Sequence, residues 1–353
     1  MGGRTYVTYV TSQSSPQPML DASGSGAAAG RRLHVSARRS VEVLAEAARL
    51  YYVEALTQQQ VASMLETTRS NVSRMLQAAR DQGIVRFQIV RPLHRERALE
   101  RSLVEQFGLR EAIVLSADRG GDTLPQVGEL GAKWLAGHVE DGMQITLSWG
   151  RTLQAMVAAM QVGQAYDVEV VQLGGDLQLD PRESGHELVR ELAACLGGRY
   201  SYLHAPAILD SPETVRELRG MQATASELDK ARRADLALVG IGSFEHGFAE
   251  QLFRSPYLTA ADRRDFDRVR PAGDILARFF DEEGVQLDTP LRHRVLALEL
   301  DELREIPTVV GIAAGQEKAR GILGALRGRL VDVLITDQPA AATALTVERD
   351  RKG

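Results

Sequence analysis

Seven short apolar runs between residues 111 and 337 most constrain how this chain can fold. They are separated mostly by amphipathic stretches and read EAIVLSA (111–117), MQITLSW (143–149), VEVVQLGG (168–175), YSYLHAP (200–206), ADLALVGIGS (234–243), TVVGIAAG (308–315) and VDVLITD (331–337). Continuous Val/Ile/Leu runs between helices are typical of parallel strands that are covered on both faces. We therefore expect residues 109–348 to form an α/β, Rossmann-like domain with a mainly parallel sheet. In such sheets ligands bind at the carboxyl ends of the strands.

Length and composition narrow the class of protein. The 353 residues suit two domains, and 44% hydrophobic with 25% charged residues is typical of a globular chain. No apolar run reaches the roughly 18–20 residues that cross a bilayer, so no membrane partner is expected. Cys195 is the single cysteine, which excludes an internal disulfide and favours a cytoplasmic location. The seven histidines show no metal-site spacing, so no metal is expected.

Charge is unevenly distributed along the chain. The net charge of −5 alone argues against a protein that binds nucleic acid. Residues 31–92, however, hold ten arginines and five acidic residues, a local charge of +5, while residues 1–30 are neutral. Residues 93–353 must then carry −10. A small basic module before a large acidic one is the asymmetry expected when only the first part meets phosphate.

The amino-terminal third divides into three parts. Residues 1–37 contain SQSSPQP and ASGSGAAAG and are expected to be a disordered tail. Residues 38–92 form a small module in which Ser40 can cap a first helix and IVRFQIV (84–90) has the alternation of a short strand. RERALERSLVEQFG (95–108) predicts a helix, so residues 93–108 are interpreted as a linker helix.

Two further helices are expected inside the small module. Thr57 can cap a helix that begins at Gln58 and places Val61, Ala62 and Leu65 on one face. The next helix has an inner face of Val72, Met75 and Leu76 and stops at Gly83. With the strand at 84–90, this order predicts a small, all-α winged helix-turn-helix domain.

A run of polar residues opens the second of these helices and points away from its apolar face. In a helix-turn-helix such residues enter the major groove, where Asn and Arg form paired hydrogen bonds with base edges. The alternative is an ordinary helical hairpin with a solvated polar face. We favour DNA binding because caps, inner face, polar residues and strand occur together. The residues expected to contact DNA are Thr57, Gln58, Arg69, Ser70, Asn71, Ser73, Arg74 and Arg86.

The turn between the two helices departs from the usual pattern. Glu66 occupies the position where Gly is favoured. If this position were left-handed, a glutamate there would cost about 1–2 kcal/mol. A different turn conformation is therefore the alternative to test.

SWGRT (148–152) closes one predicted strand and opens a helix. Free backbone N–H groups and the helix dipole make such a turn a seat for phosphate. Ser148, Gly150, Arg151 and Thr152 are therefore candidate effector-binding residues, against the alternative of a plain strand-to-helix turn.

Gly174, Gly175 and Asp176 end the following predicted strand and could form the facing rim of the site, although GGD alone is a weak signal. VGIGS (239–243) lacks the third glycine of a dinucleotide fingerprint, so no nicotinamide cofactor is expected. No other cofactor is indicated.

Several segments, in order, resemble one protein family. YYVEALTQQQVASMLETTRSNVSRMLQAARDQGIV (51–85) is similar to the DNA-binding domain of SorC/DeoR-type sugar-binding transcriptional regulators. Later segments resemble the effector domain of that family, which in turn resembles sugar-phosphate isomerases: LSWGRTL, QLGGDL, ADLALVGIGSF, GDILARFF, GQEKARGIL and VDVLITD. The resemblance covers roughly residues 40–346. It implies a cytoplasmic homo-oligomer, dimer or tetramer, that binds double-stranded operator DNA and a phosphorylated sugar effector.

The resemblance also indicates ligand residues. An acidic residue and a lysine of the family map onto Asp274 and Lys318. Lys318 lies early in the helix that follows TVVGIAAG, where a cation opposes the helix dipole unless an anion is near. Glu187, at the start of HELVREL, is a further candidate.

Two alternatives to this function stay open. The chain could be a sugar-phosphate isomerase-like enzyme with an added DNA-binding domain, since Asp176, Glu187 and Asp274 could supply a general base. The effector could also be an unphosphorylated sugar or polyol. We expect a regulator and no catalytic residues.

Overall fold

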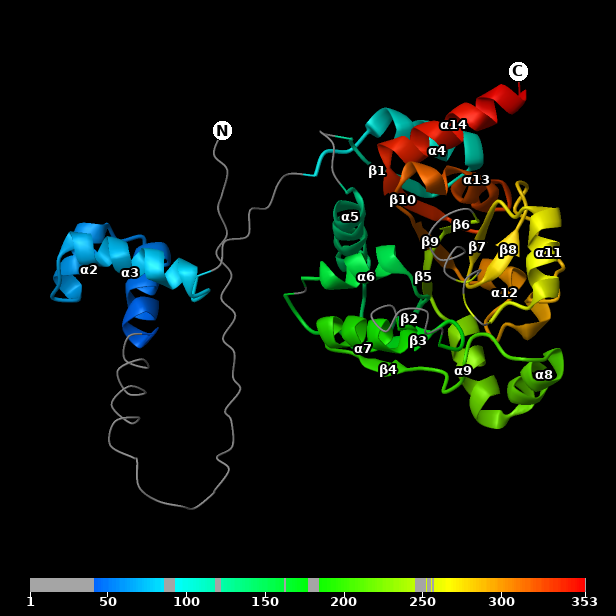
Figure 1. Cartoon of the computed structure of the whole chain (residues 1–353), viewed down its shortest axis with the longest axis horizontal. Coiled ribbons are helices and arrows are strands. Elements are labelled where there is room, and N and C mark those ends of the chain that lie inside the picture. Colours follow the sequence, from blue (N-terminus) through cyan, green and yellow to red (C-terminus); the bar gives the residue numbers. More distant parts are fainter. Residues whose placement is uncertain are drawn as a thin grey trace, which may run out of the picture. The chain divides into compact units, whose positions relative to one another are not determined.

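The computed structural model divides into two compact units, Met1–Pro92 and Leu93–Gly353 (Figure 1). It describes residues 41–85, 93–117, 122–161, 163–176, 184–244, 252, 255 and 257–352. Three predictions therefore lie outside the described residues: the tail 1–37, the cap at Ser40, and the strand beyond Val85 together with Arg86. No helix in the described ranges is long and apolar enough to cross a membrane.

The first unit contains a helix over residues 41–52, then α2 (Gln58–Met64) and α3 (Arg69–Asp81). Thr57 caps α2 as predicted, in a reciprocal arrangement with Gln60, and Gly83 follows α3 with a φ of +69°. A small apolar core holds the three helices together; its fully buried members include Ala47, Val61, Val72 and Ala79.

The turn between α2 and α3 is left-handed. Glu66 has a φ of +49°, so the alternative of a different turn conformation is wrong. Thr68 then caps α3 by accepting a hydrogen bond from the Asn71 backbone N–H at 3.2 Å. The packing of α2 against α3 therefore imposes a left-handed backbone conformation that a glutamate does not favour.

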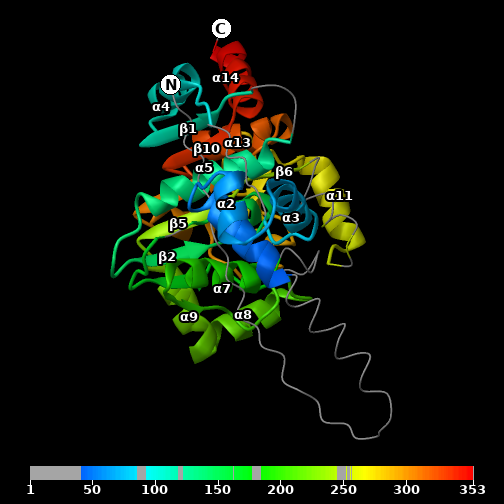
Figure 2. The same ribbon diagram turned by 90° about the vertical axis from the view of Figure 1, so that its left-hand side faces the viewer.

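The second unit is built on a seven-stranded sheet in the order β1-β10-β9-β5-β2-β3-β4. Its strands are β1 (Glu111–Leu115), β2 (Gln144–Leu147), β3 (Glu169–Gln172), β4 (Arg199–Ser201), β5 (Leu236–Gly240), β9 (Thr308–Ile312) and β10 (Val333–Asp337). Each lies in or overlaps one of the seven apolar runs, and all neighbouring pairs are parallel, which confirms the predicted sheet. Figure 2 shows β1, β10, β5 and β2 following one another in this order.

Helices cover both faces of this sheet. On one face lie α5 (Leu124–Ala136), α6 (Arg151–Ala158) and α7 (Gly185–Leu196), left of the sheet in Figure 1. The other face is covered by α4 (Arg97–Phe107), α8 (Pro212–Gly220), α9 (Gln222–Arg232), α11 (Ala260–Val269), α12 (Leu300–Arg304), α13 (Ala319–Arg327) and α14 (Gln338–Lys352). Alternate strand residues enter the two cores: Leu236 and Leu238 face the first group, whereas Ala237 and Val239 face the second.

The strand order reverses direction between β2 and β5. From β2 the chain continues to β3 and β4 on one side, and it then returns to β5, β9 and β10 on the other. A crevice forms at such a point because the connections leave the carboxyl ends of the two strands in opposite directions. The segments that follow β2 and β5 therefore border the expected ligand site.

A three-stranded antiparallel sheet, which the sequence patterns did not predict, lies beside the large one. It consists of β6 (Gly242–Ser243), β7 (Gly273–Ile275) and β8 (Arg278–Phe280). Gly242 pairs with Asp274 in this sheet, so β7 brings Asp274 next to the segment that leaves β5.

The predicted linker helix is part of the second unit. In α4, Leu103 is fully buried in the core, and Glu100 accepts a hydrogen bond from the Val114 backbone N–H of β1 at 3.0 Å. Arg95 donates to the same Glu100 carboxylate at 2.6 Å. The helix is thus fixed to the sheet edge and is not a free connector.

Helices α5 and α6 touch through their main chains. A Cβ atom added to Gly128 would lie 2.6 Å from the backbone carbon of Ala155, and one added to Gly131 would lie 3.1 Å from the Cγ of Met156. Only glycine leaves room for this close approach. The position of α6, which begins at Arg151, is therefore set directly by α5.

Replacing Glu66 by glycine should stabilise the first unit, because glycine adopts a positive φ without steric cost. We expect the free energy of unfolding of this unit to rise by about 1 kcal/mol in Glu66→Gly. Amide hydrogen exchange in α2 and α3 of the full chain measures this quantity. Glu66→Ala, which keeps a Cβ, is the matched control, and equal exchange in both variants would contradict the steric explanation.

Candidate functional site

The amino-terminal turns of α3 present the predicted polar residues to solvent. Arg69, Ser70, Ser73 and Arg74 are all exposed, whereas Val72, Leu76 and Ala79 face the core. The helix therefore has the two faces that the sequence predicted, and its outer face is available for a groove of DNA.

The two arginines on this face have no partner among the residues that the structure describes. Neither Arg69 nor Arg74 forms a hydrogen bond or an ion pair with another described residue. By contrast, Arg49 donates to Glu46 at 2.8 Å and to Glu54 at 2.5 Å, so its charge is already paired. A guanidinium without a protein partner is the group that can bind phosphate or a guanine edge.

Three other residues that were predicted to contact DNA are partly buried or hydrogen-bonded within the first unit. Asn71 is half-buried and donates from Nδ2 to the Thr67 hydroxyl at 2.8 Å. Thr57 is occupied as the cap of α2, and Gln58 is half-buried. A role of these residues in DNA binding stays a prediction, as it does for Arg86.

In the second unit the turns after β2 and β5 meet at the reversal of strand order. Ser148 is 2% exposed, and its hydroxyl accepts a hydrogen bond from the Gly240 backbone N–H at 3.2 Å. This bond ties the two turns together. Ser148 is thus positioned as a support of the crevice.

The SWGRT segment forms the predicted strand-to-helix turn. Gly150 precedes α6 with a φ of +130°, a conformation that favours glycine, and a Cβ added there would meet no atom within 4 Å. Arg151 is exposed and Thr152 is half-buried in the first turn of α6. The amino end of the helix is therefore open to an approaching anion.

Asp274 and Lys318 come together from separate elements. Asp274 lies on β7, and Lys318 ends the short 3₁₀ helix η3 (Gln316–Lys318) that leads into α13. Burial raises the pKa of Asp274 to about 6, although the nearby Lys318 ammonium and a hydrogen bond from the Ala277 backbone oppose this rise. Burial also lowers the pKa of Lys318, and the Arg151 guanidinium adds to this effect against the opposing fields of Asp274 and Glu317.

The Asp274 carboxylate has one oxygen without a partner. Its residue is 4% exposed, and Oδ1 receives no hydrogen bond in the described part of the chain. A Cβ added to Gly242 would lie 1.8 Å from this oxygen, so β6 can approach it only as glycine. A buried acceptor without a donor is costly, and a ligand hydroxyl could supply the missing hydrogen bond.

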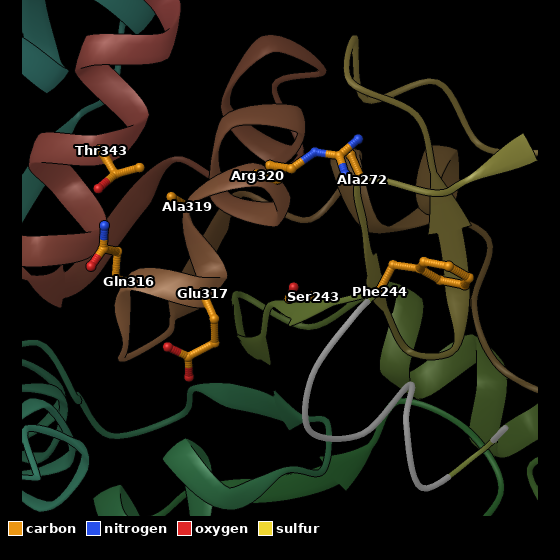
Figure 3. Close-up of a pocket in the computed structure, with 8 residues that line it drawn as sticks. All are labelled: Ser243, Phe244, Ala272, Gln316, Glu317, Ala319, Arg320 and Thr343. Atoms are coloured by element: carbon orange, nitrogen blue, oxygen red, sulfur yellow. The ribbon is translucent and has the colours of Figure 1, made fainter. Parts of the chain in front are cut away.

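In the described part of the chain, a cavity of about 460 Å³ lies next to η3, and none of the predicted effector-binding residues is among those that line it. Its walls come from β6, η3, α13 and α14, as Figure 3 shows, and its lining residues are Ser243, Phe244, Ala272, Gln316, Glu317, Ala319, Arg320 and Thr343. This volume lies within the range of about 300–1,000 Å³ of small-molecule sites. The sequence analysis missed these residues, although Gln316 and Glu317 adjoin Lys318 in the GQEKA segment and could have been included.

Contacts within the fold account for the remaining candidates. Packing explains both glycines of GGD: a Cβ would lie 2.5 Å from the Ala297 Cβ at Gly174 and 2.4 Å from the Pro206 carbonyl oxygen at Gly175. Asp176 accepts from the Gly185 backbone N–H at 2.9 Å and so supports the start of α7. Glu187 is exposed and pairs with Arg190 at 2.6 Å. Ligand contacts by these four residues stay predictions.

Both units match known protein families. Residues 91–346 match the family model of the sugar-binding domain (Sugar-bind), and residues 38–101 match a Crp-like helix-turn-helix domain. The fold and these matches define a transcriptional regulator with a helix-turn-helix and a sugar-binding domain.

Relatives and solved structures agree with this class. The chain is 32% identical to the sorbitol operon regulator of Klebsiella pneumoniae over 86% of this chain and 98% of that protein. It is 31% identical to the deoxyribonucleoside regulator of Bacillus subtilis over 86% of this chain and 97% of that protein. The crystal structure of the full-length sorbitol operon regulator SorC from Klebsiella pneumoniae matches with a TM-score of 0.66 over 87% of this chain and 99% of that chain. The chain belongs to the SorC family of sugar-binding transcriptional regulators.

Removing the Arg74 side chain should weaken DNA binding without unfolding the first unit, since Arg74 is exposed and pairs with no other described residue. A lost base-edge contact is worth about 1–3 kcal/mol, so we expect affinity to fall roughly tenfold or more in Arg74→Ala. Mobility shift on duplexes selected by the unaltered protein from a random pool measures this. Arg49→Ala, whose guanidinium is already paired, should bind normally. Equal affinities of the two variants would argue against the proposed face.

Asp274 should make the stability of the second unit depend on pH. A carboxyl whose folded-state pKa is raised to about 6 favours folding at low pH, and this contribution is lost as the pH rises through that value. Relative to Asp274→Asn, the wild-type free energy of unfolding should therefore fall by roughly 2–3 kcal/mol between about pH 4 and pH 7. Urea unfolding followed by tryptophan fluorescence measures it, since Trp134 and Trp149 both lie in this unit. A pH-independent difference between the two proteins would refute the buried carboxyl as its source.

Proposed function

We propose that the effector of this regulator is a phosphorylated sugar, held at the carboxyl ends of β2, β5 and β9. The phosphate would lie at the amino end of α6, between the Arg151 guanidinium and the Lys318 ammonium. A sugar hydroxyl would donate to Asp274, and the adjoining cavity would receive the rest of the sugar. Arginine and lysine suit phosphate, whereas a carboxylate suits hydroxyl groups.

The observation that carries this proposal is the placement of two cations and one buried carboxylate around the same crevice. Arg151 lies close enough to Lys318 to lower the pKa of the lysine, and Arg151 forms no ion pair with a described residue. Like charges in a partly buried site repel each other, and a bound dianion would relieve the repulsion. A phosphorylated ligand therefore fits this site better than a neutral sugar does.

We infer that the ligand controls DNA binding by α3 at genes of carbohydrate metabolism. A helix-turn-helix protein reads two half-sites when it is a dimer, so a homo-oligomer, dimer or tetramer, suits this role. The ligand would then favour one arrangement of the oligomer and so change the affinity of the paired helices for the operator.

We further infer that the chain acts as a regulator and not as an enzyme. The curated relatives named above are regulators of a sorbitol operon and of deoxyribonucleosides, and the sequence covers nearly their full length. Among the predicted general-base candidates, Asp176 accepts a hydrogen bond from the Gly185 backbone N–H and Glu187 pairs with Arg190, whereas Asp274 lies near Lys318. A charge pair of this last kind can bind a ligand without turning it over.

Replacing Lys318 by methionine should weaken sugar-phosphate binding while leaving the fold intact. Methionine keeps the length and apolar stem of the side chain but removes the charge that pairs with phosphate. Isothermal titration with ribose 5-phosphate, fructose 6-phosphate and glucitol 6-phosphate, each beside its unphosphorylated form, measures the effect. We expect at least one phosphorylated member to bind and its affinity to fall by tenfold or more in Lys318→Met, since charged hydrogen bonds are worth about 1.5–3 kcal/mol.

The matched control is Lys133→Met on α5, where the lysine is 58% exposed and pairs with Glu129 at 2.7 Å. This variant should bind as the unaltered protein does. Binding of a free sugar with the same affinity as its phosphate, unchanged in Lys318→Met, would overturn the proposal of a phosphorylated effector.

A further inference from the structure

The last residue of β10, Asp337, is a buried carboxylate with no assigned role. It is 1% exposed and forms no ion pair with any described residue. Its Oδ2 accepts hydrogen bonds from the Gly315 backbone N–H at 2.7 Å and from the Thr123 hydroxyl, while Oδ1 accepts one from the Ala340 backbone N–H at 3.0 Å. The loop before α5, the turn after β9 and the first turn of α14, which directly follows Asp337, thus meet at one side chain.

One of these segments is the turn that carries Lys318. Gly315 lies between β9 and η3 with a φ of +106° and a ψ of 139°, a conformation that favours glycine. The Lys318 backbone N–H donates to the Gly315 carbonyl oxygen at 2.9 Å, which closes the turn. Two hydrogen bonds therefore hold this turn, and the Asp337 carboxylate accepts one of them from the Gly315 backbone N–H.

The other two segments anchor Asp337 itself. Ala340 lies in the first turn of α14, where a carboxylate is favoured by free N–H groups and by the helix dipole. Thr123 immediately precedes α5. Asp337 therefore contacts the Lys318 turn directly, and through Thr123 it adjoins α5, whose glycines set the position of α6.

We propose that Asp337 is a positioning residue of the effector site, whose carboxylate holds the Gly315–Lys318 turn so that the Lys318 ammonium faces Asp274 and Arg151. The proposal rests on the function proposed above for Lys318. It assigns Asp337 no contact with the ligand. An asparagine at this position would keep one acceptor oxygen for α14 but would turn an N–H group toward the Gly315 N–H.

The surroundings of Lys318 give a direct readout of this role. Besides its own burial, the charged groups that influence its pKa are Asp274 on β7, Glu317 on η3 and Arg151 on α6. If the turn loosens, Lys318 becomes more solvated and its pKa returns upward toward the ordinary lysine value. If Asp337 only stabilised the fold, a folded variant at this position would leave the titration of Lys318 unchanged.

The experiment follows the lysine methyl signals of the full chain after reductive methylation with ¹³C-formaldehyde. The chain has lysines only at positions 133, 230, 318 and 352, and the signal of Lys318 is assigned by its loss in Lys318→Arg. We expect Asp337→Asn to raise the titration midpoint of Lys318 by about one pH unit. Thr123→Val, which removes a different donor from the same oxygen, should leave the midpoint unchanged.

Two results would overturn the proposal. One is a folded Asp337→Asn protein whose Lys318 titrates as in the unaltered chain, whatever its loss of stability. The other needs no variant: the Gly315 amide of the unaltered protein should be protected from hydrogen exchange, and exchange at the rate of an unprotected amide would contradict the bond. No sugar phosphate takes part in either measurement, so a failure here is distinct from a failure of the proposed effector.

Discussion

The parallel pairing of β2 with β5 is the contact on which the rest of the second unit depends. Ile145, Thr146 and Leu147 lie beside Leu236, Ala237 and Leu238, and from this pair the chain builds the sheet outward in both directions. The connections must therefore diverge above these two strands. The hydrogen bond from Gly240 to Ser148 then fixes the two turns at the base of the resulting crevice. The location of the site thus follows from strand order before any ligand-binding side chain is considered.

The charged groups of the two units differ in their exposure to solvent. In the first, the guanidinium groups of Arg69 and Arg74 stand in solvent, where a polyanion can reach them and where salt weakens the attraction. In the second, Asp274 and Lys318 are buried. Burial raises the pKa of Asp274 and lowers the pKa of Lys318, so it favours the neutral form of each. Charges in such surroundings are screened far less, so a small ligand can have a large effect there.

The sequence predicted the parts of the molecule that depend on local pattern. The seven apolar runs became the seven parallel strands, because a strand covered on both faces needs a continuous apolar run. The cap of α2 was also readable, since Thr57 acts within three residues of itself, whereas the cap of α3 by Thr68 was not predicted. By contrast, β6, β7 and β8 are two or three residues long and carry no periodicity. Their pairing arises only when distant segments meet.

The candidate site residues also differ in whether a local sequence pattern indicates them. Gly150 and Arg151 could be proposed as ligand residues because one strand-to-helix turn contains both. Asp274 and Lys318 were proposed through a family resemblance, and nothing in their spacing indicates that they lie near each other. Gly174 and Gly175 show the opposite difficulty: a glycine needed for close packing on Ala297 or Pro206 looks the same in sequence as one needed for a ligand.

The contact between α5 and α6 limits how the proposed phosphate site can vary. Where Gly128 meets Ala155, no side chain separates the two backbones, so no rotamer change can absorb a shift of one helix against the other. The close contact with α5 therefore holds α6 in place, whereas the exposed Arg151 side chain in its first turn can change conformation. Relatives with different effectors should accordingly diverge in the side chains around this turn sooner than in the glycines behind it.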